Sequence, residues 1–316
     1  MRFLLCQLCL LVLVLNSISA QVNNSRSCER HCGNISIPYP FGIGRGCFLD
    51  EWYEVQCNNS VPFLPKIRKE VVQIDLPGAA ILERGPDAVP FGFLRVKTKI
   101  VSMGCDGRGD GKEVLDFTET PFSISIDNKL VAFGCNHTAT LMHVEPRIVG
   151  CVSSCHLSYL SKGSTDECAG YQCCSASTPR DDFFKVIGVK IESNDSGSNR
   201  CAVAFLTDEL AQPSLPWDSN TSPEWFHERK YSTIQLEWQI QTRNLLLGES
   251  LGCGTINPEV PVTLNEFQSR PCYCGRIQRS DISDDIGYLK CACTNGYEGN
   301  PYDVQGCKVS SWSSTS

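Results

Sequence analysis

Three cations alternate with uncharged residues in the run "FLRVKTKIV" near the end of the first third of the chain. On a β-strand successive side chains point to opposite faces, so Arg95, Lys97 and Lys99 would share one face at a spacing of about 6.6 Å. Such a row could follow a polymer that carries regularly spaced anions, and the "KIRK" run at 66–69 could extend it. The alternative interpretation is a solvated strand face or a lysine-guarded sheet edge.

Aromatic side chains form a second group of candidates, close to the stretch "CGNISIPYPFGIGRGC" at residues 32–47. Two prolines restrict the backbone around Tyr39 and Phe41 to extended geometry, and three glycines then allow a sharp turn that also carries Arg45. Trp52 and Tyr53 follow shortly after. Flat rings beside tight turns suit a shallow binding ledge, although burial of Phe41 and Trp52 in a small core is the competing interpretation.

The elements that would position these residues are short strands. The runs "EVVQIDL", "FGFLRVKTKIV" and "FSISID" are β-prone, are punctuated by Pro and Gly, and show little helical periodicity. Further strand-like runs follow in "FFKVIGVKIE", "CAVAFL" and "TIQLEWQI". The sequence therefore predicts a mostly β, disulfide-rich, multi-module extracellular protein with short strands and long loops.

The sequence gives no support for a nucleotide site or for several common catalytic motifs. The glycine loop "FGIGRG" is not followed by a helix-forming run, so it does not predict a phosphate site. The chain has neither a His-x-x-x-His pair nor a Gly-x-Ser-x-Gly elbow, and it lacks the kinase signatures. We therefore expect no enzyme activity, no metal site and no cofactor; a secreted carbohydrate hydrolase remains an alternative, because spacing alone does not exclude a carboxylate pair.

Features of the amino terminus and the cysteines predict a secreted protein. Residues 1–20 combine an early arginine, an apolar run and small residues, which is typical of a cleaved signal peptide. The mature chain then keeps eighteen cysteines, an even set that predicts up to nine disulfides rather than zinc sites: Cys28, Cys32, Cys47, Cys57, Cys105, Cys135, Cys151, Cys155, Cys168, Cys173, Cys174, Cys201, Cys253, Cys272, Cys274, Cys291, Cys293 and Cys307. Their connectivity cannot be derived from sequence.

Glycosylation and charge agree with this compartment. Six Asn-x-Ser/Thr sequons predict solvent-facing loops, at Asn23, Asn34, Asn58, Asn136, Asn194 and Asn220. The net charge is −7; residues 28–115 hold eleven Lys and Arg against eleven Asp and Glu, whereas residues 116–316 hold fifteen against twenty-four. This balance and a secreted location argue against nucleic acid as a partner.

Cysteine clusters and polar stretches divide the mature chain into three expected modules, at residues 28–135, 151–241 and 253–307. The last is too short for a hydrophobic core of its own and would need disulfides. Residues 308–316 are expected to form a disordered tail.

The stretch at 32–47 closely resembles the opening of the galacturonan-binding module of plant wall-associated receptor kinases. The later "CAGYQCC", "CAVAFL", "LEWQI" and "GYLKCACTNGYEGNPYDVQGC" segments resemble the rest of that ectodomain, ending in an EGF-like repeat. The resemblance covers most of residues 28–307. It implies a module that binds pectin. The candidates chosen above for their charge or their flat rings are then the expected polysaccharide contacts: Tyr39, Phe41, Arg45, Trp52, Arg95, Lys97 and Lys99.

Departures from the family pattern limit what the resemblance implies. Only five cysteines lie in the EGF-like segment, so Cys253 would have to complete a set of six. Bridging calcium could join protein and pectin carboxylates, but the acidic string that begins a calcium-binding repeat is absent after Cys307.

No membrane helix or kinase follows the EGF-like segment. The chain would therefore be a secreted, kinase-free relative in the cell wall, or part of an incomplete gene model whose product continues into the plasma membrane. Pairing with full-length wall-associated kinases, as a decoy or co-receptor, is the alternative function.

Overall fold

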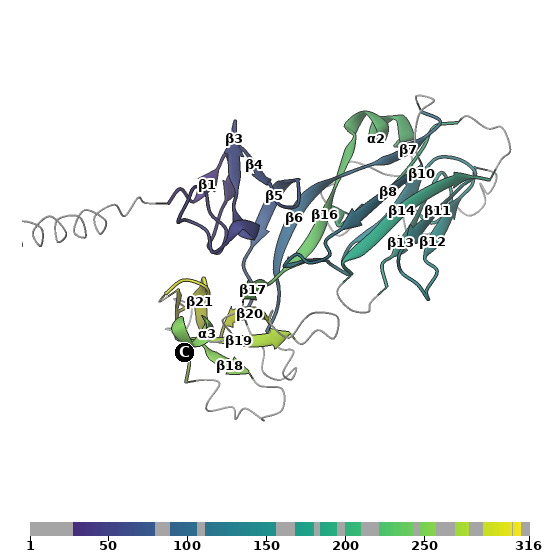
Figure 1. The fold of residues 1–316 in the computed structure, drawn as a ribbon. Coiled ribbons are helices and arrows are strands. Elements are labelled where there is room, and N and C mark those ends of the chain that lie inside the picture. Colours follow the sequence, from purple (N-terminus) through teal and green to yellow (C-terminus); the bar gives the residue numbers. More distant parts are fainter. Residues whose placement is uncertain are drawn as a thin grey trace, which may run out of the picture.

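The computed structural model describes residues 28–79, 89–105, 111–155, 168–179, 184–194, 200–209, 221–242, 247–256, 269–277, 287–304 and 306–310. Over these ranges the chain is mostly β-strand with few and short helices, and it contains nine disulfides, which confirms the predicted fold class (Figure 1). No helix in the described ranges is long and apolar enough to span a bilayer. The expected signal peptide lies outside the described residues.

A six-stranded antiparallel sheet runs through the centre of the molecule, in the order β3-β4-β5-β6-β16-β9. Its strands are β3 (Gln56–Asn58), β4 (Val61–Leu64), β5 (Lys69–Asp75), β6 (Gly92–Lys99), β16 (Tyr231–Trp238) and β9 (Phe122–Ile124). The sheet's long pair is β6 and β16, which match over eight residues from Gly92↔Trp238 to Lys99↔Tyr231. A two-stranded ribbon of β1 (His31–Cys32) and β2 (Ile35–Ser36) and the 3-10 turn η1 (Glu51–Tyr53) precede this sheet in the sequence.

Two four-stranded sheets extend from the other end of the long strands, seen in teal in Figure 1. One has the order β13-β10-β15-β7 and the other β12-β11-β14-β8. Their bounds are β7 (Val101–Met103), β8 (Lys112–Asp116), β10 (Lys129–Phe133), β11 (His137–Met142), β12 (Gly150–Ser153), β13 (Cys173–Ser177), β14 (Val186–Ser193) and β15 (Ala202–Thr207).

The alternation of side chains along β10 and β15 explains how these sheets pack. Leu130 and Ala132 face the core shared with the second sheet, whereas Val131 and Phe133 face the opposite side. There they pack against Phe226 of helix α2 (Pro223–Arg229). The helix therefore covers the outer face of β10 and β15.

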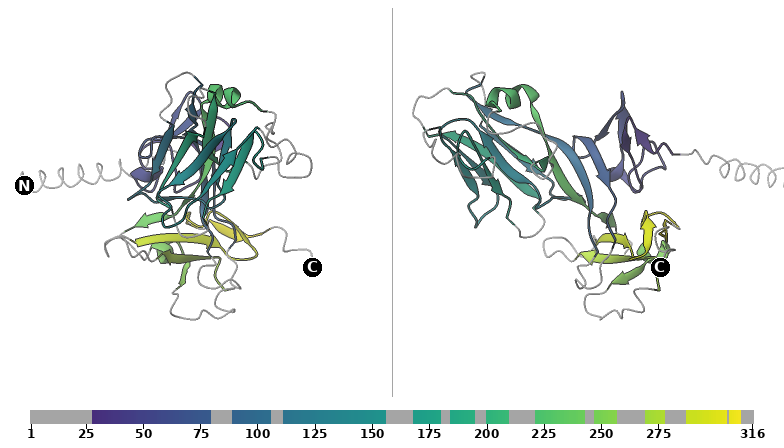
Figure 2. Two further views of the ribbon diagram at one scale, coloured as in Figure 1. Left: turned by 90° about the vertical axis from the view of Figure 1, so that its right-hand side faces the viewer. Right: turned by 180° about the vertical axis from the view of Figure 1, so that it is seen from behind.

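The carboxyl-terminal strands form a small sheet of their own at one end of the molecule, in both views of Figure 2. Its order is β17-β20-β19-β18, from β17 (Ile240–Thr242), β20 (Gly287–Cys293), β19 (Cys272–Ile277) and β18 (Gly254–Ile256), with a short helix α3 (Leu247–Ser250) and a ribbon of β21 (Tyr297–Gly299) and β22 (Cys307–Val309) beside it. β22 includes two residues that we expected in the disordered tail; residues 311–316 lie outside the described ranges.

The eighteen cysteines from Cys28 to Cys307 pair completely. The disulfides are Cys28–Cys47, Cys32–Cys57, Cys105–Cys201, Cys135–Cys155, Cys151–Cys174, Cys168–Cys173, Cys253–Cys272, Cys274–Cys291 and Cys293–Cys307. Cys253 completes the set of six in the carboxyl-terminal segment, as expected from the cysteine count. Cys105–Cys201 closes the longest loop, which spans 96 positions.

Strands from the expected modules 28–135 and 151–241 share the six-stranded sheet and the two four-stranded sheets that contain β10 and β14. β6 pairs with β16, β8 with β14, and β10 with both β13 and β15. β17, from the end of the second expected module, pairs with β20 of the third. The boundary placed between residues 135 and 151 therefore does not separate two sheets, because cysteine spacing contains no information about strand pairing.

Candidate functional site

The loop at residues 37–47 is held to the body of the protein on its inner side. Phe41 is fully buried, with its ring 5.4 Å from that of Tyr53 and 5.3 Å from that of Trp238, both edge-on. Gly42 is required there, because a Cβ would lie 1.9 Å from the carbonyl oxygen of Cys47. Phe41 is thus a core residue and cannot lie against a ligand, as the competing interpretation of the sequence held.

Tyr39 stays at the surface of this loop and is half-buried. Its carbonyl oxygen accepts a hydrogen bond of 2.7 Å from Asn300 Nδ2, so the carboxyl-terminal segment fixes its backbone. Burial raises the pKa of the Tyr39 hydroxyl, and the carboxylates of Asp303 and Asp50 raise it further, whereas Arg30 lowers it. The phenol therefore stays protonated and can donate a hydrogen bond.

Trp52 lies on the short turn η1 beside a lysine from the β4–β5 connection. The Asp50 carboxylate accepts the Trp52 backbone N–H at 2.8 Å and so fixes the start of the turn. Lys66 Nζ lies 5.8 Å from the centre of the Trp52 ring and 2.5 Å from Glu51 Oε2. The hydrogen bond from Lys66 lowers the pKa of Glu51.

Three arginines lie in the same segment of the chain as this loop and turn. Arg30, Arg45 and Arg68 are exposed and form no ion pair with any residue that the structure describes.

Tyr53, the remaining aromatic candidate, is fully buried; its hydroxyl donates to the Gln239 carbonyl oxygen at 2.7 Å.

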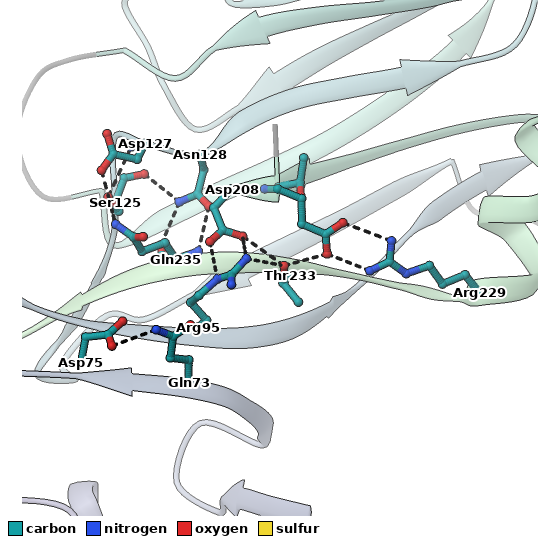
Figure 3. Close-up of polar contacts among 12 residues, drawn as sticks. Gln73, Asp75, Arg95, Ser125, Asp127, Asn128, Asp208, Arg229, Thr233 and Gln235 are labelled. Carbon is teal, nitrogen blue, oxygen red and sulfur yellow. Dashed lines mark hydrogen bonds and ion pairs between the residues drawn. The ribbon is translucent and has the colours of Figure 1, made fainter. Parts of the chain in front are cut away.

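The three cations on β6 alternate as expected, but they are not all available to a ligand. Val96 and Thr98 are buried, while Lys97 and Lys99 lie on the other face with Arg95. Arg95, however, donates to both oxygens of the Asp208 carboxylate, at 2.5 Å from Nε and 3.1 Å from Nη2 (Figure 3). Its side chain is only 12% exposed and that of Asp208 only 6%, so Arg95 is neutralised inside the protein and is not available to a polymer.

The pair belongs to a longer network that sequence reasoning missed. The Thr233 hydroxyl lies 3.0 Å from Asp208 Oδ1 and 2.8 Å from Glu209 Oε1, and it can donate to either. Glu209 in turn accepts two hydrogen bonds from Arg229 at 3.1 and 2.7 Å. Two arginine–carboxylate pairs are thus joined through one hydroxyl, with Arg95 and Arg229 at the ends (Figure 3).

Lys97 and Lys99 remain at the surface of β6. Lys97 forms an ion pair with Glu70 on β5, and its Nζ lies 4.3 Å from the centre of the Tyr231 ring. Lys99 is exposed and lies directly opposite Tyr231 in the register of β6 and β16. The mixed aromatic and basic run "WFHERKY" at 225–231 was the sequence signal for this surface, which we had not considered.

The predicted glycosylation sites lie mainly at the surface. Asn34, Asn58 and Asn194 are exposed and Asn136 is half-buried, while Asn23 and Asn220 lie outside the described residues. Glycosylation itself stays a prediction.

Comparison with known proteins identifies two family segments in the chain. Residues 28–81 match the family described as wall-associated receptor kinase galacturonan-binding, and residues 165–247 match the family described as wall-associated kinase. The first segment contains Tyr39, Arg45, Trp52 and Lys66, whereas the second contains Asp208, Arg229 and Tyr231. No solved structure matches the chain.

Among curated proteins, the chain is similar to wall-associated receptor kinase-like 17 of Arabidopsis thaliana, at 39% identity over 94% of this chain and 41% of the relative. It is also similar to putative wall-associated receptor kinase-like 11 of the same plant, at 38% identity over 95% of this chain and 41% of the relative. The chain thus spans about two fifths of the length of the relatives it matches.

Proposed function

Because the chain belongs to the ectodomain family of the plant wall-associated receptor kinases, we propose that it binds pectin whose galacturonate carboxylates are free, without catalysing a reaction. The proposal rests on one observation, which is that the family match and the aromatic and basic surface fall in the same segment. The segment that matches the galacturonan-binding family is also the segment whose surface combines Tyr39 and Trp52 with the cations Arg45 and Lys66. We propose this loop-and-turn surface as the binding site.

The chemistry of the surface suits an acidic sugar polymer. Galacturonan carries one carboxylate per sugar, so a protein of net charge −7 needs locally concentrated cations to hold it. Arg30, Arg45 and Arg68 are exposed without ion-pair partners among the described residues, and Lys66 is shared with Glu51. The rings of Tyr39 and Trp52 offer flat apolar faces to the C–H faces of pyranose rings.

Nine disulfides agree with the proposed location in an oxidising compartment, outside the cell and in the wall. Pairing with full-length wall-associated kinases stays a prediction.

The test is binding of the full chain to polygalacturonate at low and high salt. We compare wild type with Trp52→Ala combined with Lys66→Gln. Lys190→Ala is the control, because Lys190 is a half-buried, ion-paired lysine on strand β14, outside residues 28–81. We expect the double variant to bind about tenfold more weakly, which corresponds to about 1.4 kcal/mol for one ring face and one charge. Binding that responds neither to salt nor to the double variant would remove the proposed site.

A further inference from the structure

Helix α2 and the start of β16 carry a row in which aromatic rings and cations alternate. The row runs from Trp225 to Arg229, whose Cζ lies 5.7 Å from the Trp225 ring, and then to Tyr231, 5.3 Å from the same Cζ. It ends at Lys97, whose Nζ lies 4.3 Å from the Tyr231 ring. We call these four residues the α2 ladder.

The rings of the ladder are exposed although the fold does not require it. Trp225 is 41% exposed and Tyr231 37% exposed, both high for large aromatic residues. Phe226, the next residue of the helix, is completely buried and supplies the contact with Phe133 and Phe205. The packing of α2 therefore depends on Phe226, while Trp225 stays partly exposed to solvent.

The ladder is held in place before any ligand arrives. Both terminal nitrogens of Arg229 donate to the Glu209 carboxylate, which is 5% exposed, so the guanidinium between the two rings has a fixed orientation (Figure 3). Lys97 is fixed in the same way by Glu70. Such a surface loses little conformational entropy on binding.

Two uncompensated cations lie beside the ladder. Lys99 is opposite Tyr231 in the strand register, and Lys230 immediately precedes Tyr231 in the chain. Both are exposed, and neither forms an ion pair within the described part of the chain. The charges of Arg229 and Lys97 are already balanced, so Lys99 and Lys230 are the groups that would attract an anion.

We propose that the α2 ladder is a second binding site for an acidic polysaccharide, with uronate rings lying on Trp225 and Tyr231 and their carboxylates on Lys99 and Lys230. The ligand class rests on the proposed function, but the site lies outside residues 28–81, and the description of the family that matches 165–247 names no ligand. Two free lysines on a chain of net charge −7 are too few for a nucleic acid or an anionic bilayer, which need many phosphate contacts.

The experiment is calorimetric titration of the full chain with a short oligogalacturonide, to obtain both affinity and stoichiometry. The ladder variant combines Trp225→Ala with Tyr231→Ala, and a second, milder variant combines Lys99→Gln with Lys230→Asn, which keeps both rings. The loop-and-turn variant is Trp52→Ala with Lys66→Gln, and Lys190→Ala is the control. We expect two sites per chain in wild type and in the control, and one in each of the other variants.

The outcomes separate the two proposals. If the loop-and-turn variant loses a site and neither ladder variant changes affinity or stoichiometry, the ladder inference fails and the proposed function stands. If only the ladder variants lose binding, the ladder is supported and the proposed loop-and-turn site fails. Inorganic polyphosphate is a polyanion without sugar rings, so it should bind the ladder at least tenfold more weakly than the oligogalacturonide does. Equal affinity would show that only charge is recognised and would overturn the inference.

Discussion

Replacing Arg95 by alanine should destabilise the protein strongly and leave its affinity for polygalacturonate unchanged. The Asp208 side chain is 6% exposed and accepts two hydrogen bonds from Arg95. Without them the carboxylate would keep the Thr233 hydroxyl, which Glu209 shares. Removing one partner of a buried ion pair costs roughly 3–5 kcal/mol, because the other charge stays buried without compensation.

The measurement is thermal unfolding with the disulfides intact. For a domain of 150–250 residues each kcal/mol lowers the unfolding midpoint by about 2–4 °C, so Arg95→Ala should lower it by roughly 6–20 °C. Adding Asp208→Ala should recover part of the loss, since the unpaired charge is then absent, and the double-mutant cycle measures the coupling. Arg95→Lys keeps the charge but not the two-pronged geometry and should fall between wild type and alanine.

One result would refute this reasoning. If Arg95→Ala unfolds at the wild-type temperature and binds polygalacturonate much more weakly, Arg95 contacts the polymer as the sequence suggested. The ion pair with Asp208 would then contribute nothing to the stability of the fold.

Three further predictions concern single positions. Gly42→Ala should reduce secreted yield several-fold, because its Cβ would meet the Cys47 carbonyl oxygen at 1.9 Å; non-reducing electrophoresis should then show mispaired disulfides. Tyr53→Phe should lower the free energy of unfolding in urea by about 1–3 kcal/mol, since it removes the hydroxyl that donates to the Gln239 carbonyl oxygen at 2.7 Å and accepts the Gln241 N–H at 3.2 Å; an unchanged value would show that these two bonds do not stabilise the fold. Burial raises the pKa of Glu237 to about 7, so between about pH 4.5 and 7 the folded state binds more protons and stability falls as the pH rises. The decline in the free energy of unfolding should be at most about 3 kcal/mol by pH 8, and Glu237→Gln should remove it. Urea denaturation of both proteins at pH 4.5 and pH 8 measures this; if the variant still loses stability as the pH rises, Glu237 is not the group responsible.

The sequence predicted local properties well because they depend on neighbouring residues. Alternation on β6 follows from the period of a strand, and the Arg95, Lys97 and Lys99 side chains do share one face. The even cysteine count likewise predicted up to nine disulfides for an oxidising compartment, and all nine are present. Which side chains share a strand face, and which cysteines are oxidised, could therefore be predicted from sequence alone.

Partners distant in sequence could not be predicted. Asp208, which neutralises Arg95, lies 113 positions away, and nothing in the run "FLRVKTKIV" indicates it. Phe41 is buried because Trp238, far along the chain, supplies one wall of its pocket. Sequence patterns identify residues that could bind a ligand, whereas tertiary pairing decides which of them are free to do so.

The segment that matches the galacturonan-binding family depends on residues outside it. Within 28–81 the inner anchors are Phe41 and Tyr53, and both contact the region around Trp238, through a ring at 5.3 Å and a hydrogen bond to the neighbouring Gln239 carbonyl. Asn300, from the carboxyl-terminal segment, holds the backbone of Tyr39. A binding surface gains affinity from rigidity, since side chains that are already ordered lose little entropy when a ligand arrives. Because that rigidity is supplied by the end of β16 and by the carboxyl-terminal segment, we expect binding at the proposed surface to need both of these segments and not residues 28–81 alone.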